Sequence, residues 1–162
     1  YIMNTFEDIL PYWTNELWVG RVSKIEHMSS LKWNSHLWLG FGNIEITKDH
    51  SIFDKYKPTF FAVKEDDKII GVNSGFRTDD KIYRSRGLWV NPNHRGKGHS
   101  KTLLEQTIAQ GRKEGCTYIW TMPRKSALPA YESVGFNKIG GWIDEKVEFG
   151  PNCIAMRKLI NI

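Results

Sequence analysis

The chain has 162 residues, of which 40% are hydrophobic and 25% charged, and this composition is ordinary for one globular domain with a buried core. No apolar run approaches the roughly 20 residues that a membrane-spanning helix needs, so we expect no association with a membrane. The net charge of +5 suits an anionic ligand or a nucleic-acid surface, and equally a solvated basic surface.

Residues 1–57 form an aromatic and irregular first region, which we expect to be helical. Apolar residues at helical spacing predict a helix over residues 5–18. Pro11 lies inside this stretch and should either begin a second helix or kink the first. Weaker patterns favour short helices near residues 22–33 and 50–56. The apolar face of the first helix comprises Phe6, Ile9, Leu10, Trp13, Leu17 and Trp18.

Residues 58–162 alternate strand-like and helix-like patterns. We expect strands over 59–65, 68–77 and 82–90, a helix over 97–113, a strand over 116–122, a helix over 126–134, and a closing hairpin from 136–149 and 153–158. Asp66-Asp67 separates the first two strands as a turn, and Pro92 stops the third. The order β-β-β-α-β-α-β-β predicts an α/β fold with a mixed sheet flanked by helices.

The cysteine and histidine residues indicate neither a disulfide framework nor a metal centre. Cys116 and Cys153 lie far apart without CxxC spacing, so we expect reduced, buried thiols rather than a disulfide. The five His residues form no HxxxH or HExxH pair, and we therefore expect no metal site. The chain shows no signal-peptide pattern, and we expect a cytoplasmic protein.

The segment 89–101, WVNPNHRGKGHSK, joins the end of a strand to the start of the strongest helix. Gly96 and Gly98 remove side chains where the backbone must approach a ligand closely. The helix start offers unpaired N–H groups and the positive end of the helix dipole, which favour a phosphate or pyrophosphate. The alternative is a solvent-exposed glycine-rich loop. Positive charge is added at the same place by Arg95, Lys97 and Lys101.

Two nucleotide-binding motifs fail at this segment. A mononucleotide P-loop requires GxxxxGK[ST], but Arg95 and Ser100 occupy the two glycine positions. A dinucleotide fingerprint requires GxGxxG, and Lys101 stands where the third glycine should be. The segment therefore predicts an anion site that belongs to neither nucleotide-binding class.

The same segment resembles the acetyl-CoA signature of the general N-acetyltransferase (GNAT) superfamily. Val90-Asn91-Pro92 matches the VxP step at the end of a strand. Residues 95–100 match the loop pattern [RQ]xxGx[GA], except that Ser100 replaces the usual Gly or Ala. Ser is still small, so the resemblance implies only a slight change near the phosphates.

A second GNAT pattern, NxxAxxxYxxxGF, follows the next predicted strand. Ala127, Tyr131 and Gly135-Phe136 match it in order and spacing, whereas Arg124 stands at the Asn position. The resemblance covers about residues 60–158. It implies a GNAT-like mixed, mostly antiparallel sheet, splayed at the acetyl-CoA site and flanked by helices.

The resemblance also implies the organisation of the chain and its cosubstrate. Residues 1–162 would form a single acetyltransferase domain, with 1–57 on the acceptor side and 58–162 as the core that binds acetyl-CoA. The backbone of the strand end would pair with the pantetheine arm and polarise the thioester carbonyl. The implied acetyl-CoA-binding residues are Leu88, Trp89, Val90, Arg95, Gly96, Lys97, Gly98, His99, Ser100 and Lys101.

Tyr131 matches the tyrosine that protonates the departing CoA thiolate, in a reaction where the amine attacks the thioester directly. A phenol has a pKa of about 10 in water, so a positioned hydroxyl can donate as charge builds on sulfur. The alternative for Tyr131 is a core tyrosine on an amphipathic helix. A second function class stays open, that of a non-catalytic acyl-CoA-binding or sensor module. Within the enzyme class, a longer acyl-CoA is the main alternative.

The acceptor side is less defined. Many family members carry a Glu on the strand that ends at VxP, but this strand has Arg84 and Arg86 instead. Strand alternation places both on one face, where they would hold an anionic group of the acceptor or form a solvated face. Asp144 and Glu148 are candidate bases that no pattern singles out.

The aromatic residues of the first region offer a wall for the acceptor groove. These residues, which would more simply pack over the sheet, are Trp13, Trp18, Trp33 and Trp38. The acceptor itself, a small-molecule or peptide amine, is not named by the sequence. We expect no nucleic-acid partner, since no standard binding module is present. The oligomeric state, including a homodimer, is left open.

Overall fold

The computed structural model describes residues 4–17, 19, 31–32, 45–46, 57–143 and 151–159. Its centre is a six-stranded sheet in the order β3-β4-β5-β6-β8-β7. The strands are β3 (Thr59–Glu65), β4 (Lys68–Asp79), β5 (Ile82–Val90), β6 (Tyr118–Thr121), β7 (Asn137–Ile143) and β8 (Asn152–Lys158). All neighbours pair antiparallel except β5 and β6, which are parallel.

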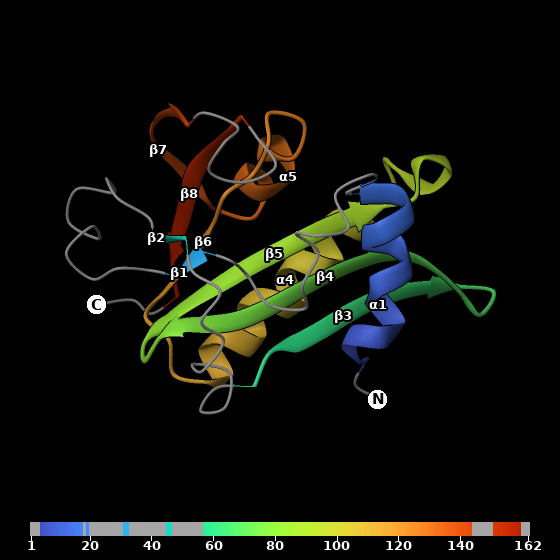
Figure 1. Ribbon diagram of the computed structural model, residues 1–162, viewed down its shortest axis with the longest axis horizontal. Helices are drawn as coiled ribbons and strands as arrows, with labels where there is room; N and C mark the ends of the chain where they lie inside the picture. The colour runs from blue at the N-terminus through green and yellow to red at the C-terminus, as the bar shows by residue number, and fades with distance from the viewer. Residues whose placement is uncertain are drawn as a thin grey trace.

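Helices cover both faces of the β3–β5 part of the sheet (Figure 1). The helix α4 (His99–Lys113) packs along one face, and α1 (Phe6–Tyr12) crosses the other. The short helix α5 (Leu128–Ser133) lies beside α4 and β7. The predicted fold class, an α/β fold with a mixed, mostly antiparallel sheet, is therefore confirmed.

The first helix begins as predicted and changes character after its proline. Thr5 and Asp8 form a reciprocal capping box, which satisfies two backbone N–H groups that the helix leaves unpaired. Pro11 lies inside α1, and the chain continues at Trp13–Leu17 as a π-helical turn, η1. The predicted break at the proline is thus an α-to-π transition rather than a new helix.

Two short strands lie in the first region, one of them where a short helix was expected. Leu31–Lys32 (β1) and Glu45–Ile46 (β2) pair as a separate antiparallel ladder, so the predicted helix over 22–33 does not hold at its end. The stretch 50–56 lies outside the described residues. β1 and β2 are strands because their backbones pair with each other across a gap in the sequence. A local pattern of apolar residues does not predict such pairing.

Elements of the second region appear in the predicted order, with shifted ends. The strand predicted over 68–77 extends to Asp79, and the helix predicted from residue 97 begins at His99. Gly98 sets that start because its φ of 82° is left-handed and not helical. The closing hairpin is described over β7 and β8, and residues 144–150 lie outside the described part.

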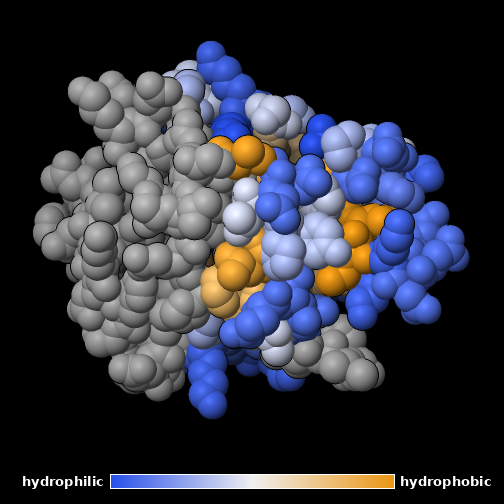
Figure 2. All heavy atoms as spheres, turned by 45° about the vertical axis from the view of Figure 1, so that its right-hand side comes forward, coloured by the Kyte–Doolittle hydropathy of each residue, from blue (hydrophilic) through white to orange (hydrophobic). Residues whose placement is uncertain are grey.

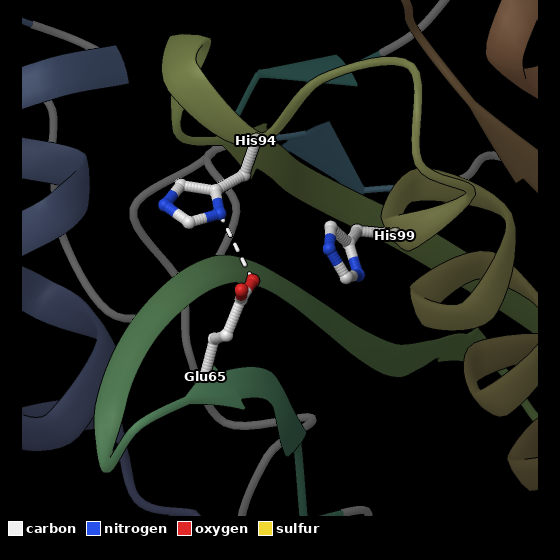
Figure 3. A group of neighbouring side chains, drawn as sticks. All are labelled: Glu65, His94 and His99. Atoms are coloured by element: carbon white, nitrogen blue, oxygen red, sulfur yellow. Dashed lines mark hydrogen bonds and ion pairs between the residues drawn. The ribbon is translucent and has the colours of Figure 1, made fainter.

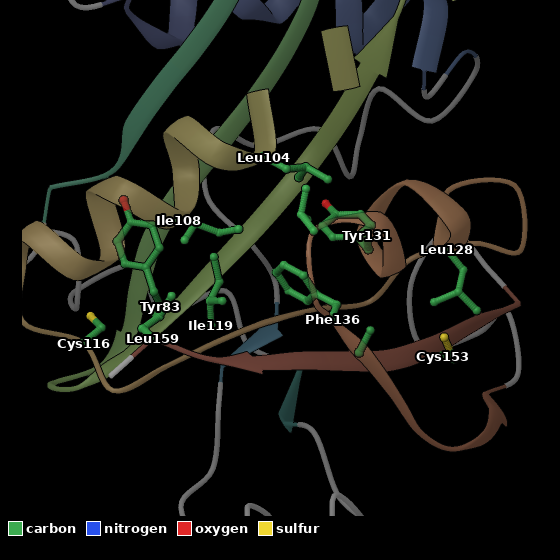
Figure 4. Close-up of a cluster of buried hydrophobic side chains, with 12 residues drawn as sticks. Tyr83, Leu104, Ile108, Cys116, Ile119, Leu128, Tyr131, Phe136, Cys153 and Leu159 are labelled. Atoms are coloured by element: carbon green, nitrogen blue, oxygen red, sulfur yellow. The ribbon is translucent and has the colours of Figure 1, made fainter. Parts of the chain in front are cut away.

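The largest core cluster joins α4, α5 and the sheet beneath them (Figure 4). Cys116 and Cys153 are both free and buried there, which confirms the expected reduced thiols. Burial raises the pKa of Cys116 to about 12 and that of Cys153 in the same direction. On the face in Figure 2, apolar side chains form small groups among hydrophilic ones. No described helix is long and apolar enough to cross a membrane.

Candidate active site

A cavity of about 460 Å³ opens where β5 and β6 separate. The two strands pair only from Ile82 to Arg84 on β5, while β5 continues to Val90 without β6 beside it. The walls come from the free end of β5, the loop before α4, the end of β6, and α5. Side chains from these segments, distant in sequence, therefore face one hollow at the splay of the sheet.

The free end of β5 contains a β-bulge at Gly87 and Leu88. Ser74 pairs with Arg86 and Val72 pairs with Trp89, so two β5 residues stand opposite the single residue Asn73. The extra residue reverses the side-chain alternation of the strand. Arg86 and Trp89 consequently lie on the same face, although one number is even and the other odd.

Gly87 is required at this bulge for two separate reasons. Its φ is +83°, a left-handed value that L side chains rarely adopt. A Cβ added there would lie 2.4 Å from the indole of Trp13, whose Nε1 donates to the Gly87 carbonyl at 2.8 Å. Sequence analysis did not single out Gly87, although an isolated glycine inside a strand pattern is a known signal for a bulge.

The loop after β5 forms the opposite end of the cavity. The short 3-10 turn η3 (Pro92–His94) leads into Gly96 and Gly98, whose φ values are 77° and 82°. The helix α4 then begins without a side-chain cap. Its first-turn N–H groups have no partner within the helix, and groups of this kind suit an anion.

Almost all the loop residues predicted to bind acetyl-CoA line this cavity. The cavity-lining residues among them are Arg95, Gly96, Gly98, His99, Ser100 and Lys101, together with Leu88, Trp89 and Val90 of β5. Lys97 is not among the cavity-lining residues. Arg95 donates from Nε to the Val90 carbonyl at 3.0 Å and so holds the loop against the end of β5.

Tyr131 lies on α5 and forms part of the cavity wall (Figure 4). Its ring is 2% exposed and packs edge-on against Phe136 at a centroid distance of 5.0 Å. The hydroxyl group lies 2.9 Å from Ser85 Oγ on β5. Tyr131 therefore belongs both to the core cluster around α5 and to the residues that line the cavity.

Ser85 belongs to a buried chain of polar side chains that the sequence did not indicate. Asn73 Nδ2 donates to Ser85 Oγ and to Thr107 Oγ1, both at 2.9 Å. Thr107 Oγ1 donates in turn to the Leu103 carbonyl at 2.8 Å. Since the Thr107 proton is used there, Thr107 must accept from Asn73, and this fixes the amide orientation of Asn73.

Arg84 and Arg86 also line the cavity, and they are buried. Their side chains are 1% and 3% exposed, and the guanidinium groups lie over Trp120 and Trp13 at 4.6 Å and 5.6 Å from the ring centres. The alternative of a solvated strand face is therefore wrong. The turn η1 packs against β5, with Trp13 at Arg86, and this packing was not visible in the strand sequence.

A family model describes the same region of the chain. The model of the acetyltransferase (GNAT) family matches residues 27–136, more than half of the 162 residues. The chain belongs to the GNAT acetyltransferase family. It is accordingly an acyltransferase that uses acyl-CoA.

Solved structures share the GNAT fold at low sequence identity. A GNAT-family acetyltransferase from Staphylococcus aureus Mu50 aligns over 98% of both chains, with a TM-score of 0.63 and 16% identity. An aminoglycoside 6'-N-acetyltransferase in complex with coenzyme A gives a TM-score of 0.57 at 11% identity, covering 65% of this chain and 75% of its own. Tetrahymena GCN5 gives 0.53 at 15%, covering 64% and 69%. No curated protein matches the chain in sequence.

The other candidate site residues of this GNAT chain either line the cavity, pack in the core or lie outside the described residues. Arg124, at the usual Asn position, lines the cavity and forms an isolated β-bridge with Asn152. Among the described residues that line the cavity, none is Asp or Glu. The candidate bases Asp144 and Glu148, and the groove aromatics Trp18, Trp33 and Trp38, lie outside the described residues. Trp13 is buried against β5.

Proposed function

We propose that this GNAT acetyltransferase transfers an acetyl group from acetyl-CoA to a primary amine by direct attack, with Tyr131 as the general acid. The observation that carries the proposal is that Tyr131 lines the cavity at the splay of β5 and β6. The same proposal treats residues 1–162 as one acetyltransferase domain. Residues 1–57 then lie on the acceptor side.

The cavity suits acetyl-CoA at both of its ends. The bulge leaves backbone groups of Gly87 and Leu88 out of regular pairing, where they can bond the pantetheine arm. The two left-handed glycines and the α4 start suit the pyrophosphate, with Arg95 and Lys101 beside them. Acetyl-CoA, when bound, supplies the activated acyl thioester.

The proposed reaction forms one bond and breaks one. The neutral amine nitrogen bonds to the thioester carbonyl carbon, and the carbon–sulfur bond breaks. The sulfur takes the proton of the Tyr131 hydroxyl, and the proton lost by the amine leaves through solvent, from which Tyr131 is reprotonated. No base among the described residues is assigned to this step, because the cavity-lining set contains no carboxylate.

The buried polar chain supports the direction of this proton transfer. Ser85 Oγ accepts from Asn73, so its own proton is available to donate to the Tyr131 oxygen at 2.9 Å. Ser85 thus donates toward the oxygen that becomes a phenolate when Tyr131 gives its proton to the CoA sulfur in this proposal. The same hydrogen bond stabilises the phenolate that the transfer leaves behind, so we propose Ser85 as a positioning residue.

The change Ser85→Ala should lower kcat by about tenfold, since a hydrogen bond to a charged group contributes about 1.5–3 kcal/mol. In a Tyr131→Phe background, Ser85→Ala should have no further effect on kcat. A tenfold loss of kcat in that background would show that Ser85 has only a structural role.

We propose that Arg84 and Arg86 bind an anionic group of the acceptor, for example a carboxylate carried by the amine. Both are buried cations on the wall of the cavity, at the end away from the pyrophosphate loop. Positive guanidinium groups on one wall attract an anionic group and repel a polycation, so these positions favour an anion. Arg124, on the same wall, adds to this preference.

The change Arg86→Met keeps the length of the buried side chain and removes its charge. We expect KM for the best amine substrate to rise about tenfold or more, while KM for acetyl-CoA changes little. Arg77→Met is the matched control, because Arg77 lies on the neighbouring strand, pairs with Glu114 at 3.0 Å, and is not among the cavity-lining residues. An unchanged acceptor KM in Arg86→Met would remove the proposed acceptor role.

The overall proposal is tested by following thiol release from acetyl-CoA with a panel of amines that differ in charge. Protein background in this assay should be small, because both cysteines are buried and burial raises the pKa of both thiols. Turnover on at least one amine supports the enzyme. Tight acetyl-CoA binding without turnover on any amine would instead favour a non-catalytic binding module.

A further inference from the structure

Three potential metal ligands converge beside the loop that precedes α4 (Figure 3). Glu65 is the last residue of β3, His94 ends the turn η3, and His99 is the first residue of α4. One ligand atom from each lies within 4.8 Å of the others. The fold thus brings together a carboxylate and two imidazoles from three separate elements.

The contacts within this group leave one nitrogen unexplained. His94 Nδ1 lies 3.0 Å from Glu65 Oε2, and that pair accounts for two of the three residues. His99 Nε2 is buried and makes no hydrogen bond with any described residue. In Figure 3 the His99 ring turns this edge toward the Glu65 carboxylate. A buried imidazole nitrogen without a partner is costly, and a metal ion would satisfy it.

We propose that Glu65, His94 and His99 form a binding site for Zn²⁺. Two His nitrogens and one carboxylate are a ligand set that Zn²⁺ favours, with the fourth position left to water. Tetrahedral ligands at the usual Zn²⁺ distances lie about 3.4 Å apart, so the group must contract by about 1 Å. Glu65 can supply this movement, because its side chain is 46% exposed and ends a strand.

The site would join the end of β3 to the loop that leads into α4. His94 and His99 both line the cavity, so a bound ion would sit at its rim and connect it to the β3–β4 hairpin. Histidine spacing did not indicate the site because Glu65 lies 29 residues before His94, and only the fold brings them together. The inference does not depend on acetyl transfer, since it concerns the binding of the metal alone.

The test is isothermal titration calorimetry of ZnCl₂ into the full chain, stripped with EDTA and dialysed. We expect one ion per chain. His99→Ala and Glu65→Gln should each weaken the Kd for Zn²⁺ at least tenfold, because mutation of a residue that merely hydrogen-bonds to a metal ligand already lowers metal affinity about 10–100-fold. Asp66→Asn is the matched control, a neighbouring carboxylate outside the group, and should leave Kd unchanged. Co²⁺ should give the visible absorption of a tetrahedral ion with the wild type and not with His99→Ala.

Thermal unfolding provides a second measurement that does not depend on heat of binding. Saturating Zn²⁺ should raise the Tm of the wild type, because the ion binds the folded chain, and should not raise that of Glu65→Gln. Two results would overturn the proposal. One is the absence of one-to-one binding to the wild type, and the other is binding that neither variant weakens, which would place the metal elsewhere in the chain.

Discussion

The change Tyr131→Phe should reduce kcat by about 100-fold and leave KM for acetyl-CoA within about twofold. The substitution removes only the hydroxyl, which lies 2.9 Å from Ser85, and keeps the ring packed against Phe136. Loss of a general acid slows departure of the thiolate, whereas the backbone and loop that would hold acetyl-CoA stay in place. Steady-state thiol release, with calorimetric binding of acetyl-CoA beside it, measures the two effects separately.

Tyr83→Phe is the matched control for this variant. Tyr83 is also a fully buried tyrosine, and its hydroxyl lies 2.7 Å from Thr59 Oγ1, away from the cavity. Burial, and after it the charge of Glu114, raises the pKa of Tyr83 well above its ordinary value, so its phenol stays neutral. We expect about 1 kcal/mol lower stability with unchanged kcat. Equal losses of kcat in both variants would contradict a specific role for Tyr131.

The change Gly87→Ala should destabilise the protein by about 3 kcal/mol and weaken acetyl-CoA binding at least tenfold. About 1–2 kcal/mol comes from a φ of +83° that alanine adopts poorly. The rest comes from overpacking, because the new Cβ would lie 2.4 Å from the Trp13 ring. Relief requires movement of Trp13 or of the bulge, and either disturbs the cavity wall. In a chain of this size the Tm should fall by about 10 °C.

Gly115→Ala separates these two causes. Gly115 has nearly the same φ, +81°, but an added Cβ would meet no atom within 4 Å. We expect a loss of about 1 kcal/mol and unchanged acetyl-CoA binding, as measured by thermal unfolding and calorimetry. If Gly87→Ala were no worse than this control on both measures, the bulge would tolerate a side chain, and its contact with Trp13 would not shape the site.

Much of the second half of the fold could be predicted from local patterns. The strand over residues 82–90 has the predicted bounds, since alternation, a turn before it and Pro92 after it all act within a few residues. The glycine-rich loop and its helix were recognisable for the same reason. The end residues were less accurate where a left-handed glycine, such as Gly98, sets the first helical position.

In the described part of the first region, the first helix was predicted and the strands β1 and β2 were missed, for an equally physical reason. The pairing of β1 with β2 depends on contact between residues 31–32 and 45–46, and neither segment is long enough to show a period. The burial of Arg84 and Arg86 also could not be read from their strand, where alternation alone allows a solvated face. Burial depends on what packs against a face, and here that includes Trp13 from η1.

The sequence by itself determined the order of the β-β-β-α-β-α-β-β elements and the places of the glycine-rich loop and of Tyr131, the candidate acid. These follow from residue type and spacing over short stretches, because turns, helix starts and motifs are local. Only the tertiary structure decided the bulge at Gly87, the polar chain from Asn73 through Ser85 to Tyr131, and the meeting of Glu65 with His94 and His99. Each of these joins residues far apart in the chain, and such contacts exist only once the sheet and its helices have packed.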